Sequence, residues 1–188
     1  MMSGHQALSS PGHTRVAIFA GGCFWCMQPP YDGMDGVIAT TVGYTGGQTP
    51  NPSYEDVSSG RTGHVEAVRI EYDPDRVSYR DLLDLFWRSI DPTDPGGQFA
   101  DQGSQYHTFI FYTDEPQRQE AEDSKTALQR SGRFKKPVVT QIRPVSAFYP
   151  AGEEHQKYYK SHALHYKTYR AGSGREGFLE KTWPQRNP

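Results

Sequence analysis

Short apolar runs alternate along this chain with segments of helical spacing, and this alternation predicts a sheet covered by helices. The expected strands span residues 16–20, 37–42, 65–72, 107–112 and 138–142. Helices are expected to begin after Cys23, at Ser78, at Pro116 and at Glu153. Two long loops, residues 46–63 and 91–105, are rich in Gly and Pro, and long ordered loops are often functional.

The composition fits a single globular domain. The chain has 188 residues, of which 35% are apolar, and a formal net charge of −2. This small charge predicts no broad attraction to nucleic acid or acidic membranes, and no apolar run approaches a transmembrane span. Residues 1–14 are polar and lack the pattern of a signal peptide. We expect them to form a disordered tail before one domain at residues 15–188.

Both cysteines fall in one stretch, Gly21-Gly22-Cys23-Phe24-Trp25-Cys26. A strand followed by two glycines and a helical start places Cys23 at a helix N-terminus, where unpaired N–H groups and the helix dipole stabilise a thiolate. The two aromatic residues supply an apolar wall for a small substrate group, and Cys26 is close enough to trap an oxidised Cys23. Two thiols are too few for a disulfide scaffold, so we expect a reactive pair in a reducing cytosol rather than two structural cysteines.

Glu66 is the second candidate for chemistry. In a strand over residues 65–72, Glu66 shares a face with Val68, Ile70 and Tyr72. A carboxyl group on an apolar face loses solvation, its pKa rises, and it can then donate a proton near neutral pH. The alternative is a carboxylate at the strand end that reaches solvent, and the pattern alone does not decide between the two.

Several blocks of the sequence together resemble a known family. They are Gly-Cys-Phe-Trp-Cys at 22–26, Gly-Tyr-Thr-Gly-Gly at 43–47, Asn-Pro-Ser-Tyr at 51–54, Ser-Gly-Arg-Thr-Gly-His-Val-Glu-Ala-Val at 59–68, Asp-Gln-Gly-Ser-Gln-Tyr at 101–106, Phe-Lys-Lys-Pro at 134–137, Phe-Tyr-Pro at 148–150 and Glu-Glu-His-Gln at 153–156. In this order they resemble the A-type peptide methionine sulfoxide reductases over residues 15 to 183.

The resemblance implies a fold and a set of site residues. The fold is α/β (α+β), a two-layer sandwich with a ferredoxin-like mixed sheet core and a long irregular C-terminal tail over residues 169–188. The resemblance implies that Cys23 is the nucleophile and Glu66 the acid. It implies that the hydroxyls of Tyr54 and Tyr106 bind the sulfoxide oxygen. Phe24 and Trp25 would form the methyl pocket, and Asp101 would be a polar loop residue of the site.

The resemblance also implies the reaction, which is thiol-dependent reduction of methionine-S-sulfoxide, free or in proteins, as a repair of oxidative damage. Cys23 becomes a sulfenic acid, and thioredoxin or another dithiol reduces the oxidised enzyme without a resident cofactor. Many relatives have Gly where this chain has Cys26 and resolve through C-terminal cysteines, which are absent here. We therefore infer that Cys26 forms a disulfide with Cys23, although a small external thiol could regenerate Cys23 instead. A monomer in the cytoplasm is expected.

Two other classes of protein share single features of this sequence. A thioredoxin-like disulfide oxidoreductase would also carry C-x-x-C after a strand, but with turn residues between the cysteines rather than Phe-Trp. A structural zinc module could use Cys23 and Cys26 with two of His155, His162 and His165, yet the first histidine after Cys26 is His64, which is a poor spacing for zinc. The stretch from 155 to 169 is instead interpreted as a solvated helical face, and no metal is expected.

Overall fold

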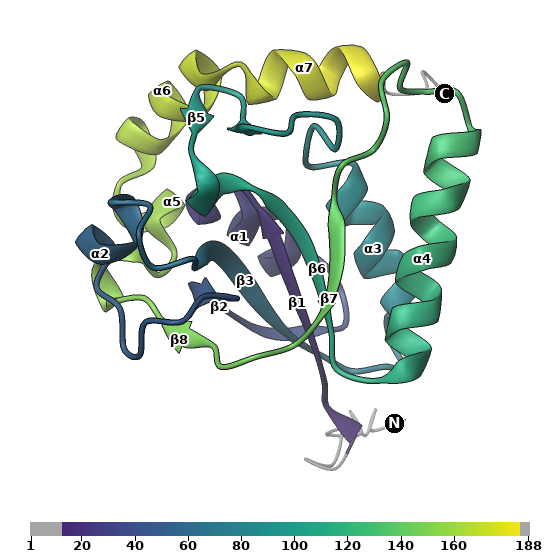
Figure 1. Ribbon diagram of the computed structural model, residues 1–188, viewed down its shortest axis with the longest axis horizontal. Coiled ribbons are helices and arrows are strands. Elements are labelled where there is room, and N and C mark those ends of the chain that lie inside the picture. Colours follow the sequence, from purple (N-terminus) through teal and green to yellow (C-terminus); the bar gives the residue numbers. More distant parts are fainter. Residues whose placement is uncertain (1–12, 185–188) are drawn as a thin grey trace, which may run out of the picture.

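A six-stranded mixed sheet forms the centre of the protein (Figure 1), as seen in a computed structural model that describes residues 13–184. The strand order is β7-β6-β1-β3-β2-β8. The strands are β1 (Arg15–Gly21), β2 (Val37–Thr45), β3 (Val65–Tyr72), β6 (Thr108–Tyr112), β7 (Gln141–Pro144) and β8 (Tyr149–Pro150). A separate hairpin pairs β4 (Gly97–Gln98) with β5 (Asp101–Gln102). The predicted tail at residues 1–14 lies almost wholly outside the described residues.

The core has ferredoxin-like topology. Strand β1 lies between β3 and β6 and is antiparallel to both, and β2 is antiparallel to β3. Helix α1 (Phe24–Asp32) follows β1 and helix α3 (Tyr79–Trp87) follows β3, which gives the β-α-β-β-α-β order of that motif. The predicted two-layer fold is confirmed.

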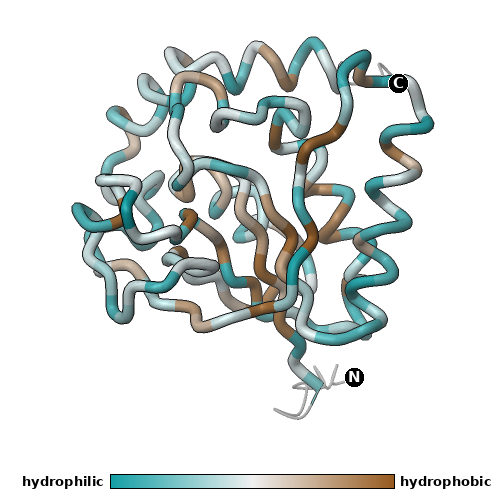
Figure 2. The backbone as a smooth tube through the Cα atoms, viewed as in Figure 1, coloured by the Kyte–Doolittle hydropathy of each residue, from teal (hydrophilic) through white to brown (hydrophobic). Residues whose placement is uncertain are grey.

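One face of the sheet packs on helices. The main core joins Phe19 of β1, Val68 and Ile70 of β3, and Leu82 and Phe86 of α3. In Figure 2 the hydrophobic colouring gathers on the central strands and the outer helices are mostly hydrophilic. Helix α4 (Glu115–Arg130) covers one edge of this layer, and Ser78 and Asp81 form the predicted capping box at α3. None of the helices in the described part has the length and apolar character needed to cross a membrane.

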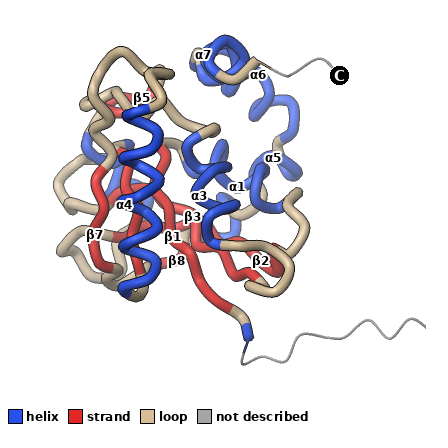
Figure 3. Tube along the Cα trace, turned by 90° about the vertical axis from the view of Figure 1, so that its right-hand side faces the viewer, coloured by secondary structure: helices blue, strands red, loops and turns tan. Residues whose placement is uncertain are grey.

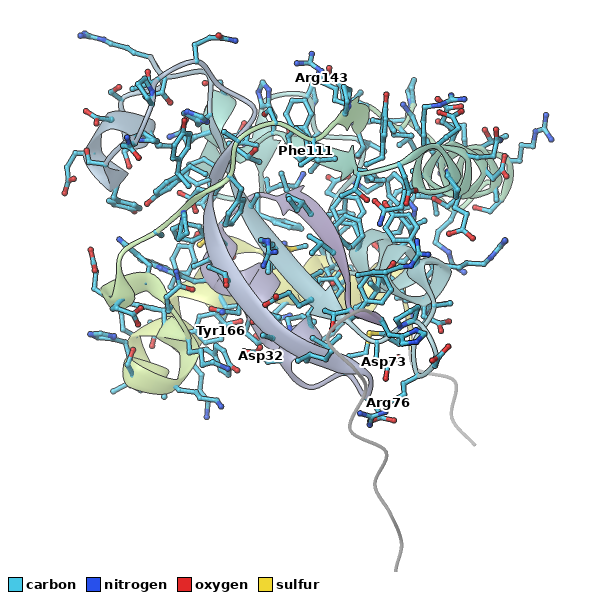
Figure 4. All side chains as sticks on the ribbon, turned by 90° about the horizontal axis from the view of Figure 1, so that it is seen from below. Asp32, Asp73, Arg76, Phe111, Arg143 and Tyr166 are labelled. Atoms are coloured by element: carbon cyan, nitrogen blue, oxygen red, sulfur yellow. The ribbon has the colours of Figure 1, made fainter. Side chains whose placement is uncertain are left out.

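The other face of the sheet carries a smaller cluster built from Ile18, Ala20, Val65, Phe109 and Phe111, with Phe148 packed against it. Figure 4 shows Phe111 and Arg143 on this side, while Tyr166 and Asp32 lie on the opposite side of the sheet. The guanidinium of Arg143 lies 5.1 Å from the centre of the Phe109 ring. Phe148 and the Arg143 guanidinium therefore pack on this face of the sheet.

The C-terminal region corrects the prediction of an irregular tail. Two helices, α6 (Ala163–Ser173) and α7 (Arg175–Thr182), follow the short α5 (Tyr158–Ser161) and run across the end of the sheet (Figures 1 and 3). Gly174, with φ +93°, ends α6 and begins α7. Gly172, Ser173 and Gly174, which are typical of an irregular segment, instead end helix α6. Gly174 can do so because glycine adopts this left-handed conformation without steric cost.

Three smaller predictions also need correction. Strand β7 begins at residue 141 rather than 138, because the N–H groups of Val138 and Val139 donate to the Gln129 side chain and to the Pro92 carbonyl instead of a strand. The helix expected at 153–160 breaks at Lys157, where φ is +51°. The loop at 46–63 contains a helix, α2 (Tyr54–Ser58), capped reciprocally by Ser53 and Asp56.

Candidate active site

The turn between β1 and α1 places Cys23 as predicted. Cys23 is the N-cap residue of α1, is 5% exposed, and its carbonyl accepts a hydrogen bond from the Cys26 N–H at 3.0 Å. Gly22 has φ +87°, and a Cβ there would lie 2.6 Å from the Gln98 Cβ. Only glycine fits both the conformation and the close approach, so this residue fixes where the thiol begins.

Glu66 lies buried directly beside this turn. It is 2% exposed, and its Oε1 accepts a hydrogen bond from the Phe24 N–H at 3.1 Å. Burial raises the pKa of Glu66 to about 8, with Asp101 and Cys26 acting in the same sense, while the Phe24 N–H opposes the shift. The carboxyl group is therefore mostly protonated at neutral pH and can donate a proton, which is one of the two alternatives that the strand pattern left open.

The two thiols differ in their environments. Both cysteines are free and buried. Burial, Cys26 and the nearby carboxyl groups of Glu66 and Asp101 raise the pKa of Cys23. A hydrogen bond from Cys23 lowers the pKa of Cys26, against the effect of burial, and the positive charge of Arg175 acts in the same direction. The helix terminus therefore does not keep Cys23 ionised in the free enzyme, which corrects the expectation of a resting Cys23 thiolate.

The two predicted tyrosines border the same site. Tyr54 is the first residue of α2, and Tyr106 ends a 3-10 turn at Ser104–Tyr106. Both are half-buried, and burial followed by the charge of Glu66 raises the pKa of each hydroxyl, with Cys23 acting on both. Both hydroxyls therefore stay protonated at neutral pH and are hydrogen-bond donors on the side of Glu66 and Cys23.

The two aromatic residues after Cys23 have different roles in packing. Phe24 is 1% exposed and packs against Tyr44 and His155, with ring centres 5.7 and 5.5 Å away. Trp25 is half-buried, stacks on Tyr158 at 4.0 Å, and donates from its indole N–H to His155 Nδ1 at 3.2 Å. Phe24 thus belongs mainly to the core, and Trp25 provides the more accessible apolar wall.

Asp101 connects the site to the C-terminal helices. It lies on β5 and accepts a hydrogen bond from the Tyr169 hydroxyl of α6. The same hydroxyl lies near Cys23. Burial, then Cys23 and Asp101, raises the pKa of Tyr169, so this hydroxyl remains a donor at neutral pH. Asp101 therefore helps to order the site, in agreement with its predicted position.

Sequence reasoning missed most of what the C-terminal segment (residues 153–182) contributes. The interpretation of residues 155–169 as a solvated helical face holds for 160–165, 167 and 168, which are exposed, but is wrong for His155, which is 8% exposed and stacks on Tyr54 at 4.5 Å. The aromatic residues at 158, 166 and 169 are partly buried, and their helical spacing could have indicated that one side of the segment packs. Tyr44 was also missed, although its buried hydroxyl faces Glu66 across the β2–β3 pair and has no hydrogen-bond partner in the described residues.

Metal binding finds no support in the described part of the chain, where no three of the His, Cys, Asp and Glu side chains group closely enough to hold an ion. His155 is instead bonded to Trp25, and His165 Nδ1 shares a hydrogen bond with the Tyr158 hydroxyl. The zinc-module alternative therefore lacks a site within residues 13–184.

Comparisons with known proteins agree with the geometry. The profile of the family described as "Peptide methionine sulfoxide reductase" matches residues 15–187. Peptide methionine sulfoxide reductase MsrA of Bacillus licheniformis is 54% identical over 173 residues, covering 92% of this chain and 96% of its own. The MsrA of Bacillus subtilis is 53% identical over 169 residues, covering 90% and 96%.

Solved structures of the same kind share the fold. Reduced Mxr1 from Saccharomyces cerevisiae superposes with a TM-score of 0.77 and 30% identity, covering 82% of this chain and 88% of its own. Methionine sulfoxide reductase A of Corynebacterium diphtheriae gives a TM-score of 0.73 and 32% identity, covering 83% and 78%. With a buried acid beside a buried thiol at the start of α1, the chain belongs to the peptide methionine sulfoxide reductase family and is an A-type enzyme, a peptide-methionine (S)-S-oxide reductase.

Proposed function

We propose that this enzyme reduces methionine-S-sulfoxide through Cys23 as nucleophile and Glu66 as general acid. The observation that carries the proposal is the hydrogen bond from the Phe24 N–H to Glu66 Oε1, which holds a buried, protonated carboxyl group next to the residue that follows Cys23. A nucleophile and a proton donor are the two groups that sulfoxide reduction requires.

The first step transfers the sulfoxide oxygen to the enzyme. The Cys23 sulfur attacks the sulfoxide sulfur while Glu66 gives its proton to the sulfoxide oxygen and takes up the thiol proton of Cys23. The S–O bond of the substrate then breaks, the protonated oxygen becomes bonded to the Cys23 sulfur, and methionine leaves. The hydroxyls of Tyr54 and Tyr106, both protonated at neutral pH, bind the developing negative charge on the oxygen. The products are methionine and a Cys23 sulfenic acid, in which the sulfenic oxygen carries the proton that Glu66 gave, while Glu66 carries the proton that left the thiol.

Substrate recognition uses the apolar wall. The half-buried indole of Trp25 receives the S–CH₃ group, with Phe24 packed beneath it. The Trp25 indole N–H donates a hydrogen bond to His155, and the Trp25 ring stacks on Tyr158. The C-terminal segment therefore holds the Trp25 ring in place. Asp101 lies on the polar side of the substrate pocket, where it accepts a hydrogen bond from the Tyr169 hydroxyl.

Regeneration uses Cys26. Its thiol attacks the Cys23 sulfenic acid, a disulfide forms, and water leaves. Thioredoxin then reduces the disulfide by thiol exchange, returning both thiols. Cys26 lines an open groove with Pro29, Pro30, Tyr166 and Arg170, which gives a reductant a route to this sulfur. Mxr1 of yeast has been solved in complex with Trx2, which supports a thioredoxin as the external reductant.

Separate S and R epimers of a blocked methionine sulfoxide test the proposal, each assayed with a small dithiol. The enzyme should reduce the S epimer alone, and Cys23→Ser should abolish reduction while Cys26→Ser retains it with the dithiol. A thioredoxin-like disulfide oxidoreductase would instead reduce insulin and leave both sulfoxides unchanged. Substantial sulfoxide reduction by Cys23→Ser would contradict the assignment of the nucleophile.

A further inference from the structure

Arg175 is a buried cation for which the proposed reaction has no role. It is 2% exposed, and it forms no ion pair with a carboxylate among residues 13–184. Its guanidinium donates to the Ser89 carbonyl at 2.6 Å and to the Gly21 carbonyl at 3.0 Å. It also lies 4.7 Å from the centre of the Phe99 ring. A buried charge without a counter-charge is costly, so its position calls for an explanation.

The surroundings show that Arg175 is built into the turn that carries Cys23. A Cβ on Gly22 would lie 3.0 Å from an Arg175 nitrogen, so the guanidinium packs directly on the Gly21-Gly22 backbone. Its own backbone is held as well, because the Arg175 N–H donates to Ser173 Oγ at 3.3 Å, and the Ser173 carbonyl accepts from the Ala100 N–H at 3.1 Å. The start of α7 is thereby fixed against the Gly21-Gly22 turn, and the end of α6 against the β4–β5 hairpin.

Few charged groups act on Cys26, and they come from several elements. Arg175 and Arg170 are the cations, from α7 and α6, and Arg170 is partly exposed and already pairs with Glu176 at 3.8 Å. Asp101 of β5 and Glu66 of β3 are the carboxyl groups, and Tyr166 of α6 and the Cys23 thiol are the other titratable neighbours. Of these two cations, only Arg170 is therefore paired with a carboxylate among the described residues, and Arg175 is the buried positive charge that acts on Cys26.

We propose that Arg175 is a positioning residue for the regeneration step, in which it holds the Gly21-Gly22 turn and stabilises the thiolate of Cys26. The Arg175 guanidinium also donates to Met27 Sδ at 3.8 Å, at the residue directly after Cys26, and a permanent positive charge in this position favours the Cys26 thiolate. The hydrogen bond from Cys23 is the main cause that lowers the pKa of Cys26, and the charge of Arg175 acts in the same direction. The role depends on the proposed function of Cys26 as the resolving thiol.

The step balances in atoms and electrons. The Cys26 thiolate attacks the sulfur of the Cys23 sulfenic acid, the S–S bond forms and the S–O bond breaks. The Cys26 sulfur is oxidised and the Cys23 sulfur is reduced. The departing hydroxide takes up the proton that Cys26 had lost, and water leaves. Arg175 neutralises the negative charge on Cys26 before the attack and neither gives nor takes a proton.

Alkylation of a single thiol tests the proposal. In a Cys23→Ser background, which leaves Cys26 alone, the rate with iodoacetamide is followed from about pH 5 to about pH 10. Arg175→Met should slow alkylation at pH 7 by about fivefold, because the thiolate fraction falls, and Arg175→Lys should recover much of the rate. Arg133→Met is the matched control, since that guanidinium donates to the Thr182 carbonyl of the same segment, far along α7 from the start where Arg175 lies.

The outcomes separate this proposal from the proposed function. A pH profile of Arg175→Met that coincides with the parent, or with Arg133→Met, would overturn the role of Arg175. If Arg175→Met does not fold, Arg175→Gln takes its place, because glutamine also removes the charge, and a pH profile of Arg175→Gln that coincides with the parent would overturn the role as well. The assay contains neither sulfoxide nor thioredoxin, so a failure of Cys26 as resolving thiol would show only in turnover by Cys26→Ser.

Discussion

The turn that carries Cys23 and the C-terminal segment that lies over it both border the reactive sulfur, but they are held by different kinds of contact. Backbone groups fix the turn, through the Gly22 conformation and the bond from the Phe24 N–H to Glu66. Side chains hold the C-terminal segment, through the bonds of Tyr169 to Asp101 and of Trp25 to His155.

This difference suggests that the two regions act in different steps of the reaction. The turn and Glu66 supply the groups for oxygen transfer, which must be positioned before substrate arrives. The C-terminal segment supplies Tyr169 beside Cys23 and Arg175 beside Cys26. We therefore expect changes in the first region to affect methionine formation most, and changes in the second to have smaller effects or to act on regeneration.

Glu66→Gln should have the largest effect among variants that retain both thiols. Glutamine keeps the size and can accept the Phe24 N–H, but it has no proton to give, so methionine formation in a single turnover should slow by about 10²–10⁴-fold. Glu71→Gln is the matched control on the same strand, because Glu71 is partly exposed and pairs with Arg69. Wild-type speed in Glu66→Gln would make Glu66 a packing residue.

Cys26→Ser should separate the two halves of the cycle. Without reductant, the variant should still release about one methionine per enzyme, because the first attack needs only Cys23. Turnover driven by thioredoxin should fall sharply, and turnover with a small dithiol should largely persist. Thiol counting should show two thiols lost per cycle in the wild type and a sulfenic acid in the variant. Full thioredoxin-driven turnover would show that oxidised Cys23 is reduced directly.

The pH dependence of methionine formation in a single turnover should follow the protonation of Glu66. Because the acid form is required and its pKa is raised to about 8, the single-turnover rate should be level at neutral pH. Above pH 8 it should fall by about tenfold for each further pH unit. Quenched-flow measurement of methionine formation checks this, and Glu66→Gln should remove the decline. A rate that rises through pH 8 would mean that ionisation of Cys23, and not the acid, limits the step.

The sequence predicted the parts of the site whose signals are local. A strand, two glycines and a cysteine lie within one short stretch, and the alternation of residues 65–72 placed Glu66 on the apolar face, although it left open whether the carboxyl group reaches solvent. Tyr54, Tyr106 and Asp101 came from the family resemblance, since loop residues carry no periodic pattern.

The C-terminal contribution was missed because its contacts join residues far apart in the chain. Trp25 and His155 are separated by 130 residues, and Arg175 and Gly21 by 154. Polar and aromatic residues in this segment suggested an exposed helix and a tail, and much of the segment is exposed, but long-range partners bury His155 and Arg175. The resting state of Cys23 was likewise misjudged, because the helix terminus is local but the burial and the carboxyl groups around the thiol are not.

Tyr169→Phe should give the smallest effect and tests how far the C-terminal segment enters the first step. The change removes the hydroxyl that donates to Asp101 near Cys23 but keeps the ring against Trp25. Loss of one such hydrogen bond corresponds to about 1 kcal/mol, so single-turnover methionine formation should slow by roughly fivefold. Tyr159→Phe is the control, since that hydroxyl donates to Asp32 at the far end of α1. A loss as large as that of Glu66→Gln would mean that both regions carry out oxygen transfer together, and the division between them would fail.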